Sequence, residues 1–564
     1  MSDEFVFPPA IIGESQARPD ALDKVTGTTQ YPADRIESGM IRGAVVFAHR
    51  PRARLLEIDV AAIEAMPGVL AVLTARDVPF NAFGLIDHDQ PVLVATGDEV
   101  RFTGDKVALV LAETPDIASA AACALPVQYE DLTPILDPGL AMRPGAPLIH
   151  AGHESNVLIH VPIRKGDVAT AFAAADVVLS GAFTTTWQEH AYLQPEAGTA
   201  WVDGLGRLVI ETAGQWLHED RRQIAAMLEL DESAVIVRYN AIGGAFGGRE
   251  DLSIQHLLAL AAWRLRDRFP QRKVAIQWSR EESMTGHHKR HPMRIETSWA
   301  AKRDGTVTAV RSRIVADGGA YASTSAEVMK CATIFATGCY EIPNIETDGY
   351  VAYTNNIPSG AFRGFGAPQA QFAAESMMTR LAHALAIDPA DIRRRNMYRE
   401  GSLEPTGQPL PAGVSALPVL DAAITEMASR MPEWRDEEVP PHVRRGYGIA
   451  SGIKNVGYSF GYPDNATATV ELFGRGEIER AIVRVGAAEV GQGTHLAMRQ
   501  IAAGVLSVEM SQIDMVTDDS SDAPNAGSAS ASRLTLLAGG AVHAAAMDAL
   551  QRYQGSEEQH VVAT

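Results

Sequence analysis

Residues 243–250, a stretch rich in glycine, constrain this chain more than any other feature. They read Gly-Gly-Ala-Phe-Gly-Gly-Arg-Glu and lie between a run typical of a strand, 234–239, and a run typical of a helix, 252–265. A glycine-rich turn lets the backbone approach a ligand closely and can point free N–H groups at it. The glycines do not follow the G-x-G-x-x-G spacing of a dinucleotide fingerprint. A tight turn packed for steric reasons explains the stretch equally well.

Four other loops of small or amide residues occur along the chain, at 187–196, 361–366, 486–493 and 525–532. Each loop taken alone is more often a simple turn. However, three of them precede a run typical of a helix, as the first stretch does, and helix N-termini offer backbone donors to anions. Together the loops predict a large anionic ligand, such as a cofactor that carries phosphates and ring nitrogens.

Length and composition are those of a multidomain globular protein. The 564 residues suffice for three or four domains, and 46% apolar with 21% charged residues is ordinary. No apolar run reaches the ~18–20 residues that span a bilayer, and the acidic start lacks the order of a signal peptide. A net charge of −20 argues against nucleic acid as a partner. Three cysteines without a C-x-x-C pair fit neither a disulfide framework nor a cluster, so we expect a reducing, cytoplasmic compartment.

Strand and helix patterns divide the chain into three regions, 1–140, 150–420 and 440–564, and the last ends in a polar tail at 554–564. Linkers or breaks rich in Pro, Gly or charge are expected at 138–147, 401–418 and 433–441. The strands expected are 41–47, 69–73, 107–112, 177–185, 208–212, 234–239, 274–278, 466–472 and 481–485, with a β-rich passage at 295–314. The helices expected are 115–125, 215–228, 252–265, 367–386, 389–396, 494–506 and 537–552.

Two motifs suggest other chemistry. Residues 457–461 match the G-x-S-x-G elbow of serine hydrolases, but that motif needs a helix directly after the serine, and here Tyr-Pro-Asp-Asn follows. Residues 287–291 hold three histidines that could bind a metal, yet two cations lie among them and no carboxylate stands at a ligand spacing. A serine hydrolase is therefore disfavoured, and a polar loop is the better interpretation of the histidines.

In order along the chain, these loops resemble those of the molybdenum-binding large subunit of the xanthine dehydrogenase / aldehyde oxidase family of molybdenum hydroxylases. The matching text is Gln188-Glu189-His190, 243–250, Arg290-His291-Pro292, 361–366, 490–493 and 528–532. The resemblance covers nearly the whole chain. It implies a multidomain α+β and α/β fold: a small N-terminal α/β hammerhead-like domain at 1–140, a first molybdopterin-binding domain at 150–420 and part of a second at 440–564.

The resemblance implies molybdenum held by molybdopterin, which in bacteria is usually the cytosine dinucleotide form. Because this chain has too few cysteines for clusters, an iron–sulfur subunit and an FAD-binding subunit are implied as partners. The residues implied at the metal are Gln188, Phe246, Arg363 and Ala531. Those implied at the pterin and its pyrophosphate are Gly247, Gln492 and Ser532.

The family reaction implied is oxidation of a small molecule, an aromatic N-heterocycle (purine-like) or an aldehyde, with water as the oxygen source. Glu250 stands where purine-oxidising members place a substrate-binding carboxylate, and Phe365 where an aromatic wall stacks on the substrate. Tyr458 or Phe460 is expected to form the opposite wall. A carboxylate can bond ring N–H groups, and a phenyl face orients a flat ring. Near Cys331 the substrate-binding Arg of some purine-oxidising members is absent, which weakens the case for a purine.

Family chains continue beyond the position matched by residues 549–550, and the continuation carries a glutamate that acts as the general base. We find no such glutamate, and Glu489 lies in a different motif. Losing a positioned base costs about 10²–10⁴ in rate. Two expectations follow: another polypeptide supplies the missing C-terminal part, or this is a truncated or split chain that binds cofactor or partners without turnover.

Overall fold

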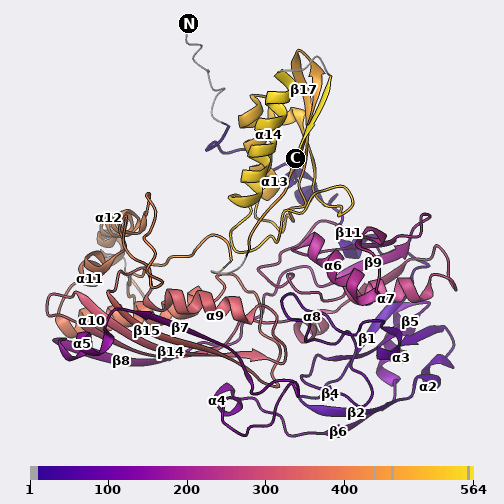
Figure 1. The fold of residues 1–564 in the computed structure, drawn as a ribbon, viewed down its shortest axis with the longest axis horizontal. Coiled ribbons are helices and arrows are strands. Elements are labelled where there is room, and N and C mark those ends of the chain that lie inside the picture. The colour runs from indigo at the N-terminus through magenta and orange to yellow at the C-terminus, as the bar shows by residue number, and fades with distance from the viewer. Residues whose placement is uncertain (1–10, 437, 459–462, 555–558) are drawn as a thin grey trace.

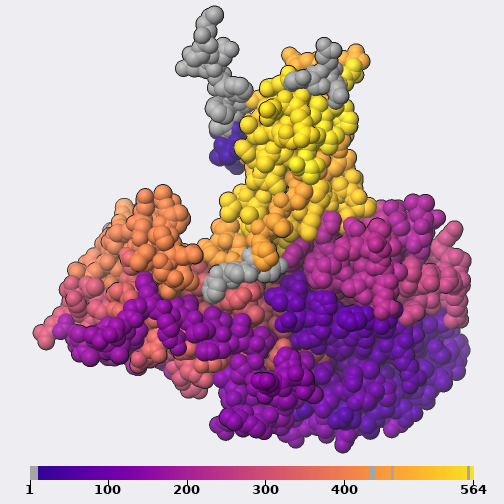
Figure 2. Space-filling view, viewed as in Figure 1, coloured from indigo at the N-terminus to yellow at the C-terminus, as the bar shows by residue number. Residues whose placement is uncertain are grey.

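Three sheet-based bodies meet near the middle of the molecule in the computed structural model, which describes residues 11–436, 438–458, 463–554 and 559–564 (Figure 1). A seven-stranded sheet, flanked by a three-stranded one, forms one body at the base, and a five-stranded sheet forms the other. A four-stranded sheet with its two helices stands above both (Figure 1). In the space-filling view an open notch separates this upper body from the α11–α12 region (Figure 2).

The seven-stranded sheet joins two regions that the sequence separates at residues 138–147. Its order is β11-β10-β9-β12-β1-β5-β3, and β1 pairs in parallel with β12 from Ile41 opposite Val274. The strands are β1 (Ile41–Phe47), β3 (Val69–Leu73), β5 (Lys106–Ala112), β9 (Ala197–Val202), β10 (Leu208–Thr212), β11 (Val235–Tyr239) and β12 (Val274–Gln277). The helices in this body are α2 (Val60–Glu64), α3 (Pro115–Ala124), α6 (Leu217–Leu228), α7 (Gln255–Leu265) and α8 (Arg280–Gly286). β5 is buried at every residue because strands cover both its edges and helices pack on its faces.

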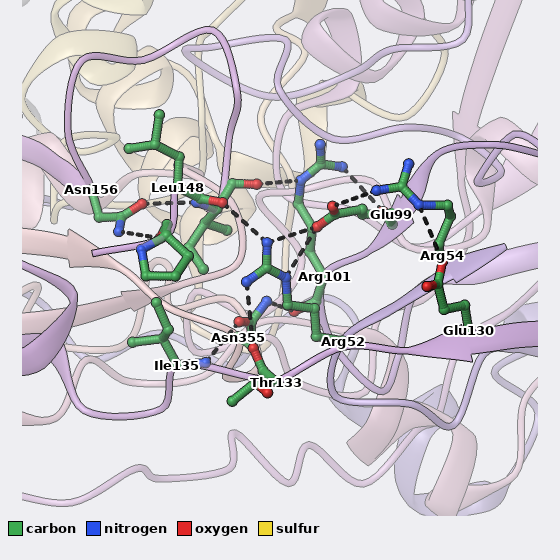
Figure 3. Close-up of polar contacts among 12 residues, drawn as sticks. Arg52, Arg54, Glu99, Arg101, Glu130, Thr133, Ile135, Leu148, Asn156 and Asn355 are labelled. Carbon is green, nitrogen blue, oxygen red and sulfur yellow. Dashed lines mark hydrogen bonds and ion pairs between the residues drawn. The ribbon is translucent and has the colours of Figure 1, made fainter. Parts of the chain in front are cut away.

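A polar network fastens the three-stranded sheet to the chain that follows it (Figure 3). This sheet consists of β2 (Ala53–Ile58), β4 (Glu99–Val100) and β6 (Val127–Asp131). Arg52 binds Glu99 at 2.9 Å and donates to the carbonyls of Thr133 and Leu148. Asn355 donates to the Arg101 carbonyl at 2.8 Å. The expected linker at 138–147 therefore lies against the protein, and it begins with a short helix, α4 (Pro138–Ala141).

The five-stranded sheet has the order β7-β15-β14-β13-β8. Its strands are β7 (Val157–Lys165), β8 (Val177–Thr184), β13 (Met293–Ala301), β14 (Val307–Gly319) and β15 (Asn344–Tyr353). The accompanying helices are α5 (Val168–Ala173), α9 (Ser325–Ile334), α10 (Ala367–Leu385), α11 (Pro389–Asn396) and α12 (Ala416–Asp436). α12 was not expected, because Pro418 suggested a break. Proline is tolerated in the first helical turn, where its missing N–H has no partner to lose.

The upper body differs from the prediction at its C-terminal end. Its sheet has the order β18-β17-β16-β19, with β16 (Thr469–Arg475), β17 (Glu477–Arg484), β18 (Ile513–Val516) and β19 (His560–Ala563). α13 (Thr494–Leu506) and α14 (Leu537–Gln554) contact each other beside it. The expected polar tail at 554–564 is wrong in its last part, since β19 pairs antiparallel with β16 and buries Val561 and Ala563.

The N-terminal segment connects the upper body to the base. Gln500 on α13 donates to the carbonyls of Ile11 and Glu14, at 2.9 and 3.1 Å. Arg18 then donates to the Gly491 carbonyl at 2.7 Å, before α1 (Ala21–Thr26). Among the described residues, no helix combines the length and apolarity needed to cross a bilayer.

Candidate functional site

The glycine-rich stretch 243–250 is pressed against the loop 361–366. The Arg363 amide donates to the Phe246 carbonyl at 2.9 Å. Gly247 has φ +102, and a Cβ added to it would lie 2.6 Å from the Ala361 carbonyl oxygen. A residue with a side chain would overlap this backbone unless one of the two loops moved. The two loops therefore form one wall of a cradle.

Two glutamines that were not predicted as site residues hold the stretch in shape. The Gly247 and Arg249 amides donate to Gln215 Oε1 at 3.1 Å each, and the Gly243 amide donates to Gln194 Oε1 at 2.7 Å. The expectation that these amides are free for a ligand is thus wrong. The stretch also does not open a helix directly, since α7 begins only at Gln255.

Gln215 also contacts the third region of the chain, residues 440–564. Its carbonyl accepts the Ala529 amide at 2.8 Å, and its side-chain Nε2 donates to the Ala529 carbonyl at 2.9 Å. The sequence placed Gln215 inside a helix, whereas the structure places it just before α6. One side chain thus links loop 525–532 to the stretch 243–250. No sequence pattern signals such a long-range amide contact.

The site loops hold non-glycine residues in left-handed backbone conformations. The φ values are +58° at Phe246, +53° at Phe365, +51° at Ala531 and +54° at Ser532. Such conformations cost energy in non-glycine residues and persist only where the surroundings enforce them, as they often do at functional sites. The resemblance had implied a cofactor or substrate role for all four, and Phe246 remains 45% exposed. Strained backbone therefore gathers on the loops that are expected to face a ligand.

Gln188 lies beside a cavity of about 370 Å³ that α10 also lines. Its side-chain oxygen accepts from Arg290 Nε, and Arg290 also donates to the Arg363 carbonyl at 3.0 Å. The Arg290 guanidinium stacks 3.9 Å above the Phe362 ring, and burial lowers the pKa of Arg290 to about 10. Arg290 thereby fixes the positions of both Gln188 and the 361–366 loop, while Arg363 itself is exposed.

Glu250 is fully buried, and only one of its two carboxyl oxygens has a hydrogen-bond partner in the described part of the chain. Ser528 Oγ approaches its Oε1 at 3.5 Å, and Oε2 has no hydrogen-bond partner among the described residues. Burial raises the pKa of Glu250 to about 7, although Ser530 partly opposes this shift. An unsatisfied buried carboxyl oxygen is costly unless a ligand completes it. Glu250 can therefore accept from, or when protonated donate to, a bound molecule.

Phe365 and Tyr458 form a corner. Their ring centroids lie 6.1 Å apart with an interplanar angle of 75°, so the edge of one ring meets the face of the other. Tyr458 Oη lies 2.7 Å from Ser530 Oγ, and Ser530 interacts with Glu250. Tyr458 thus stands beside Phe365 and does not face it across a gap. Phe460, and with it most of the G-x-S-x-G motif, lies outside the described residues.

The loop 486–493 is shaped by Glu489. Its carboxylate accepts the amides of Gly491 and Gly493 at 2.9 Å each and that of His495 at 3.2 Å. Gln492 is exposed, and its side chain bonds the Val490 amide at 2.7 Å. Glu489 therefore supports the turn before α13.

The histidine segment 287–291 is a loop, as expected, but it is buried behind the site. His288 pairs with Asp251 at 3.0 Å, and its Nε2 lies 3.2 Å from the carbonyls of both Gly247 and Ala361. Glu189, His190 and His287 bring potential metal-ligand atoms within 4.8 Å of one another. Lys289 Nζ lies 2.7 Å from Glu189, however, and its charge occupies the place of a cation. The segment therefore braces the two cradle loops.

These features fit a ligand held close to the backbone. The cradle leaves no space for a Cβ at Gly247, and Glu250 has an oxygen without a partner among the described residues. Arg363, Gln492 and Ser532, on the loops 361–366, 486–493 and 525–532, are exposed. Family models of a molybdopterin cofactor-binding domain match residues 149–397 and 422–563. A model described as the aldehyde oxidase and xanthine dehydrogenase a/b hammerhead domain matches residues 26–133.

This chain belongs to the aldehyde oxidase and xanthine dehydrogenase family of molybdenum-dependent oxidoreductases. The predicted family and its mixed α/β fold are confirmed. A probable xanthine dehydrogenase subunit from Bacillus subtilis (strain 168) is 35% identical over 525 residues, 93% of this chain and 68% of that protein. The nicotinate dehydrogenase large molybdopterin subunit of Eubacterium barkeri is 37% identical over 414 residues, 73% of this chain and 95% of that subunit.

Solved structures agree with this assignment. The aldehyde oxidoreductase from Desulfovibrio gigas superimposes with a TM-score of 0.90 at 28% identity, over 99% of this chain and 64% of that chain. Quinoline 2-oxidoreductase from Pseudomonas putida 86 gives a TM-score of 0.85 at 26% identity, over 96% of this chain and 71% of that chain. The family member described here therefore spans less than two thirds of the length of the aldehyde oxidoreductase.

Proposed function

We propose that this chain is the molybdenum-cofactor subunit of a hydroxylase that oxidises an aromatic N-heterocycle, with water as the source of the oxygen. The observation that carries this proposal is the buried Glu250, whose Oε2 has no partner among the described residues, within the same cradle as the strained Phe365. A ring nitrogen or ring N–H is the group that such a carboxyl completes. Two relatives named for N-heterocycles, nicotinate and quinoline, support this choice.

An aldehyde is the second candidate substrate. The TM-score of 0.90 with an aldehyde oxidoreductase supports it. An aldehyde offers Glu250 only a carbonyl oxygen, which can accept from the protonated carboxyl but has no N–H for the ionised one. A heterocycle can pair with both forms of Glu250, and this favours the heterocycle.

The cofactor in this proposal is molybdopterin in the cytosine dinucleotide form. Gln188, Phe246, Arg363 and Ala531 would line the metal, and Gly247, Gln492 and Ser532 would hold the pterin and its pyrophosphate. When bound, the group supplies the two-electron oxidation of a substrate carbon. Gln492 and Gly493 lie directly before the N-terminus of α13, where the Glu489 carboxylate already accepts the Gly493 and His495 amides.

The residues of this chain position the substrate and control a proton. Phe365 orients the flat ring, and Tyr458 closes one side of the space beside it. Burial raises the pKa of Glu250 to about 7, so its protonated and ionised forms are both populated near neutral pH. The protonated form donates to a ring nitrogen, and the ionised form accepts from a ring N–H. This exchange stabilises charge that moves within the ring.

Partner chains complete the proposed enzyme. The described cysteines are free thiols, two of them buried, so iron–sulfur clusters and FAD are assigned to an iron–sulfur subunit and an FAD-binding subunit. Glu250 is given the substrate contact and Glu489 shapes the loop 486–493, so we assign the general base to a companion polypeptide. A relative named a large molybdopterin subunit, 95% of which this chain covers, supports such a division. We place the complex in the cytoplasm, where free thiols persist.

The test is turnover by the chain co-expressed with the products of its neighbouring genes in molybdenum-replete cells. A panel of N-heterocycles and aldehydes is offered with an artificial electron acceptor in ¹⁸O-labelled water. We expect hydroxylated heterocycles that carry ¹⁸O. Labelled product from aldehydes alone would favour the second candidate. Complete inactivity of a molybdenum-loaded complex would favour a chain that binds cofactor or partners without turnover.

A further inference from the structure

A second, larger cavity of about 880 Å³ lies beside the candidate site. α10 lines one side of it, and the segment 449–454 lines the other. Pro368 and Phe372 line both this cavity and the one that contains Gln188, and Gly364 from the cradle loop also reaches it. The cavity therefore adjoins the loop 361–366, which carries Phe365.

The charges on the cavity wall are predominantly positive. The titratable residues that line it are Glu375, Arg380, Arg393 and Lys454. Glu375 pairs with Arg393 at 2.9 Å and also accepts the Ser451 amide at 3.0 Å, so these two charges neutralise each other. Within the described part of the chain, Arg380 and Lys454 have no carboxylate within 4.0 Å. Two uncompensated cations in one cavity stand out in a chain of net charge −20.

Lys454 is the cation that hydrogen bonds link to the candidate site. Its Nζ donates to Asn455 Oδ1 at 2.6 Å and to the Asn455 carbonyl at 3.1 Å. Asn455 Nδ2 in turn donates to the carbonyls of Gly457 and Tyr458, at 3.0 and 3.3 Å. Lys454 therefore belongs to the short segment that places Tyr458 against Phe365. Arg380, in contrast, is exposed and lies over the Phe183 ring at 5.0 Å.

The same segment also contacts α9. Cys331 Sγ on α9 is 3.8 Å from Asn455 Oδ1. Cys331 is buried and neutral, because burial raises the pKa of its thiol to about 11. The neutral thiol of Cys331 therefore gives Lys454 no counter-ion.

We propose that Lys454 binds an anionic substituent of the substrate, and that the substrate class is the heteroaromatic carboxylates. This proposal rests on the proposed function, since it deepens the choice of an N-heterocycle. In it, Glu250 contacts the ring nitrogen, Phe365 orients the ring and the Lys454 ammonium pairs with the carboxylate. A lysine that is half-buried and lacks a protein counter-ion gains most from such a partner.

Two readouts test the proposal with Lys454→Met and Lys454→Arg. Equilibrium binding of pyridine-3-carboxylate and of pyridine-3-carboxamide is measured by calorimetry, and kcat and KM are measured for the same pair. The two molecules have nearly the same shape and differ in charge. Lys302→Met, at an exposed hairpin position, is the matched control, and Arg380→Met tests the other cation. Molybdenum content is checked in every variant.

We expect Lys454→Met to weaken carboxylate binding by about 10- to 100-fold, the range for a charge-assisted contact, and to raise KM more than it lowers kcat. Binding of the carboxamide should change less than about threefold, and Lys454→Arg should retain most of the affinity. An equal loss for both molecules, or a selective loss in Arg380→Met alone, would overturn the assignment. If wild-type protein binds the carboxylate through Lys454 but oxidises neither molecule, the proposed function fails while this inference stands.

Discussion

The Arg363 amide donates to the Phe246 carbonyl at 2.9 Å, and this bond joins two loops that come from different sheets of the molecule. Beside it, Gly247 lies against the Ala361 carbonyl, and His288 touches both of these residues from behind. The cradle is therefore a property of packing between loops. A substitution that adds a single atom at this contact should therefore distort the cradle.

Gly247→Ala should disrupt the cradle. The added Cβ would lie 2.6 Å from a backbone oxygen, so one loop must move. We expect a loss of stability of about 1–3 kcal/mol from overpacking, in addition to the conformational cost, and a large loss of bound molybdenum. Gly206→Ala is the control, because Gly206 also has a positive φ but an added Cβ there meets nothing within 4 Å. Equal molybdenum contents in the two variants would contradict the prediction.

Glu250→Gln should change substrate preference without removing the cofactor. Glutamine retains an acceptor but cannot exchange a proton with a ring nitrogen. We expect kcat/KM for N-heterocycles to fall by about 10- to 100-fold and that for aldehydes to change little. Steady-state kinetics and metal analysis measure both effects, with the exposed Glu154→Gln as control. A parallel loss of metal and activity would refute this role for Glu250.

Glu489→Gln should loosen the 486–493 loop. The variant loses charge-assisted bonds to the amides of Gly491, Gly493 and His495. We expect less bound molybdenum per chain, while activity per bound molybdenum keeps its pH profile. Glu479→Gln, at an exposed position of β17, is the control. Full metal content with no activity would instead identify Glu489 as the base.

Asp220 should make stability depend on pH. It is fully buried between Tyr239 Oη at 2.8 Å and Gln255 Nε2 at 3.3 Å, and burial raises its pKa to about 8. The folded state therefore keeps a proton that the unfolded chain has already lost, and stability falls as pH rises from about 4 to about 8. Asp220→Asn cannot ionise and should lose this dependence.

Denaturant unfolding at pH 5 and pH 8 measures the effect in wild type and Asp220→Asn. We expect the stability of the variant relative to wild type to increase from pH 5 to pH 8, by about 3–4 kcal/mol. Asp131→Asn, at an exposed position of β6, is the control. An unchanged difference at the two pH values would show that the Asp220 carboxyl is ionised in the folded protein.

Much of the fold could be predicted from the sequence because local patterns determine it. α13 begins and ends at the predicted residues, since a left-handed Gly493 precedes it and its apolar positions repeat with helical spacing. β1, β3 and β10 also match their predicted bounds. β19 was missed because a strand of four residues shows too little alternation, and its place is set by the edge of β16.

In the candidate site, too, features marked by local residue types could be predicted, and contacts between distant residues could not. The loops at 243–250, 361–366 and 525–532 could be recognised because glycines and small residues mark close backbone approach. Gln215, Gln194 and the pair of His288 with Asp251 could not, because each bonds a loop distant in sequence. Burial of the 287–291 segment likewise depends on Gly247 and Ala361, which lie elsewhere in the chain.

The most direct test of the central claim is the content of molybdenum and acid-released cytidine nucleotide per chain, measured on folded protein purified with its co-expressed neighbours. If the five loops close around a molybdopterin cytosine dinucleotide, both contents should approach one per chain, and both should fall together in Gly247→Ala. Folded wild-type protein from molybdenum-replete cells with neither component would contradict the account.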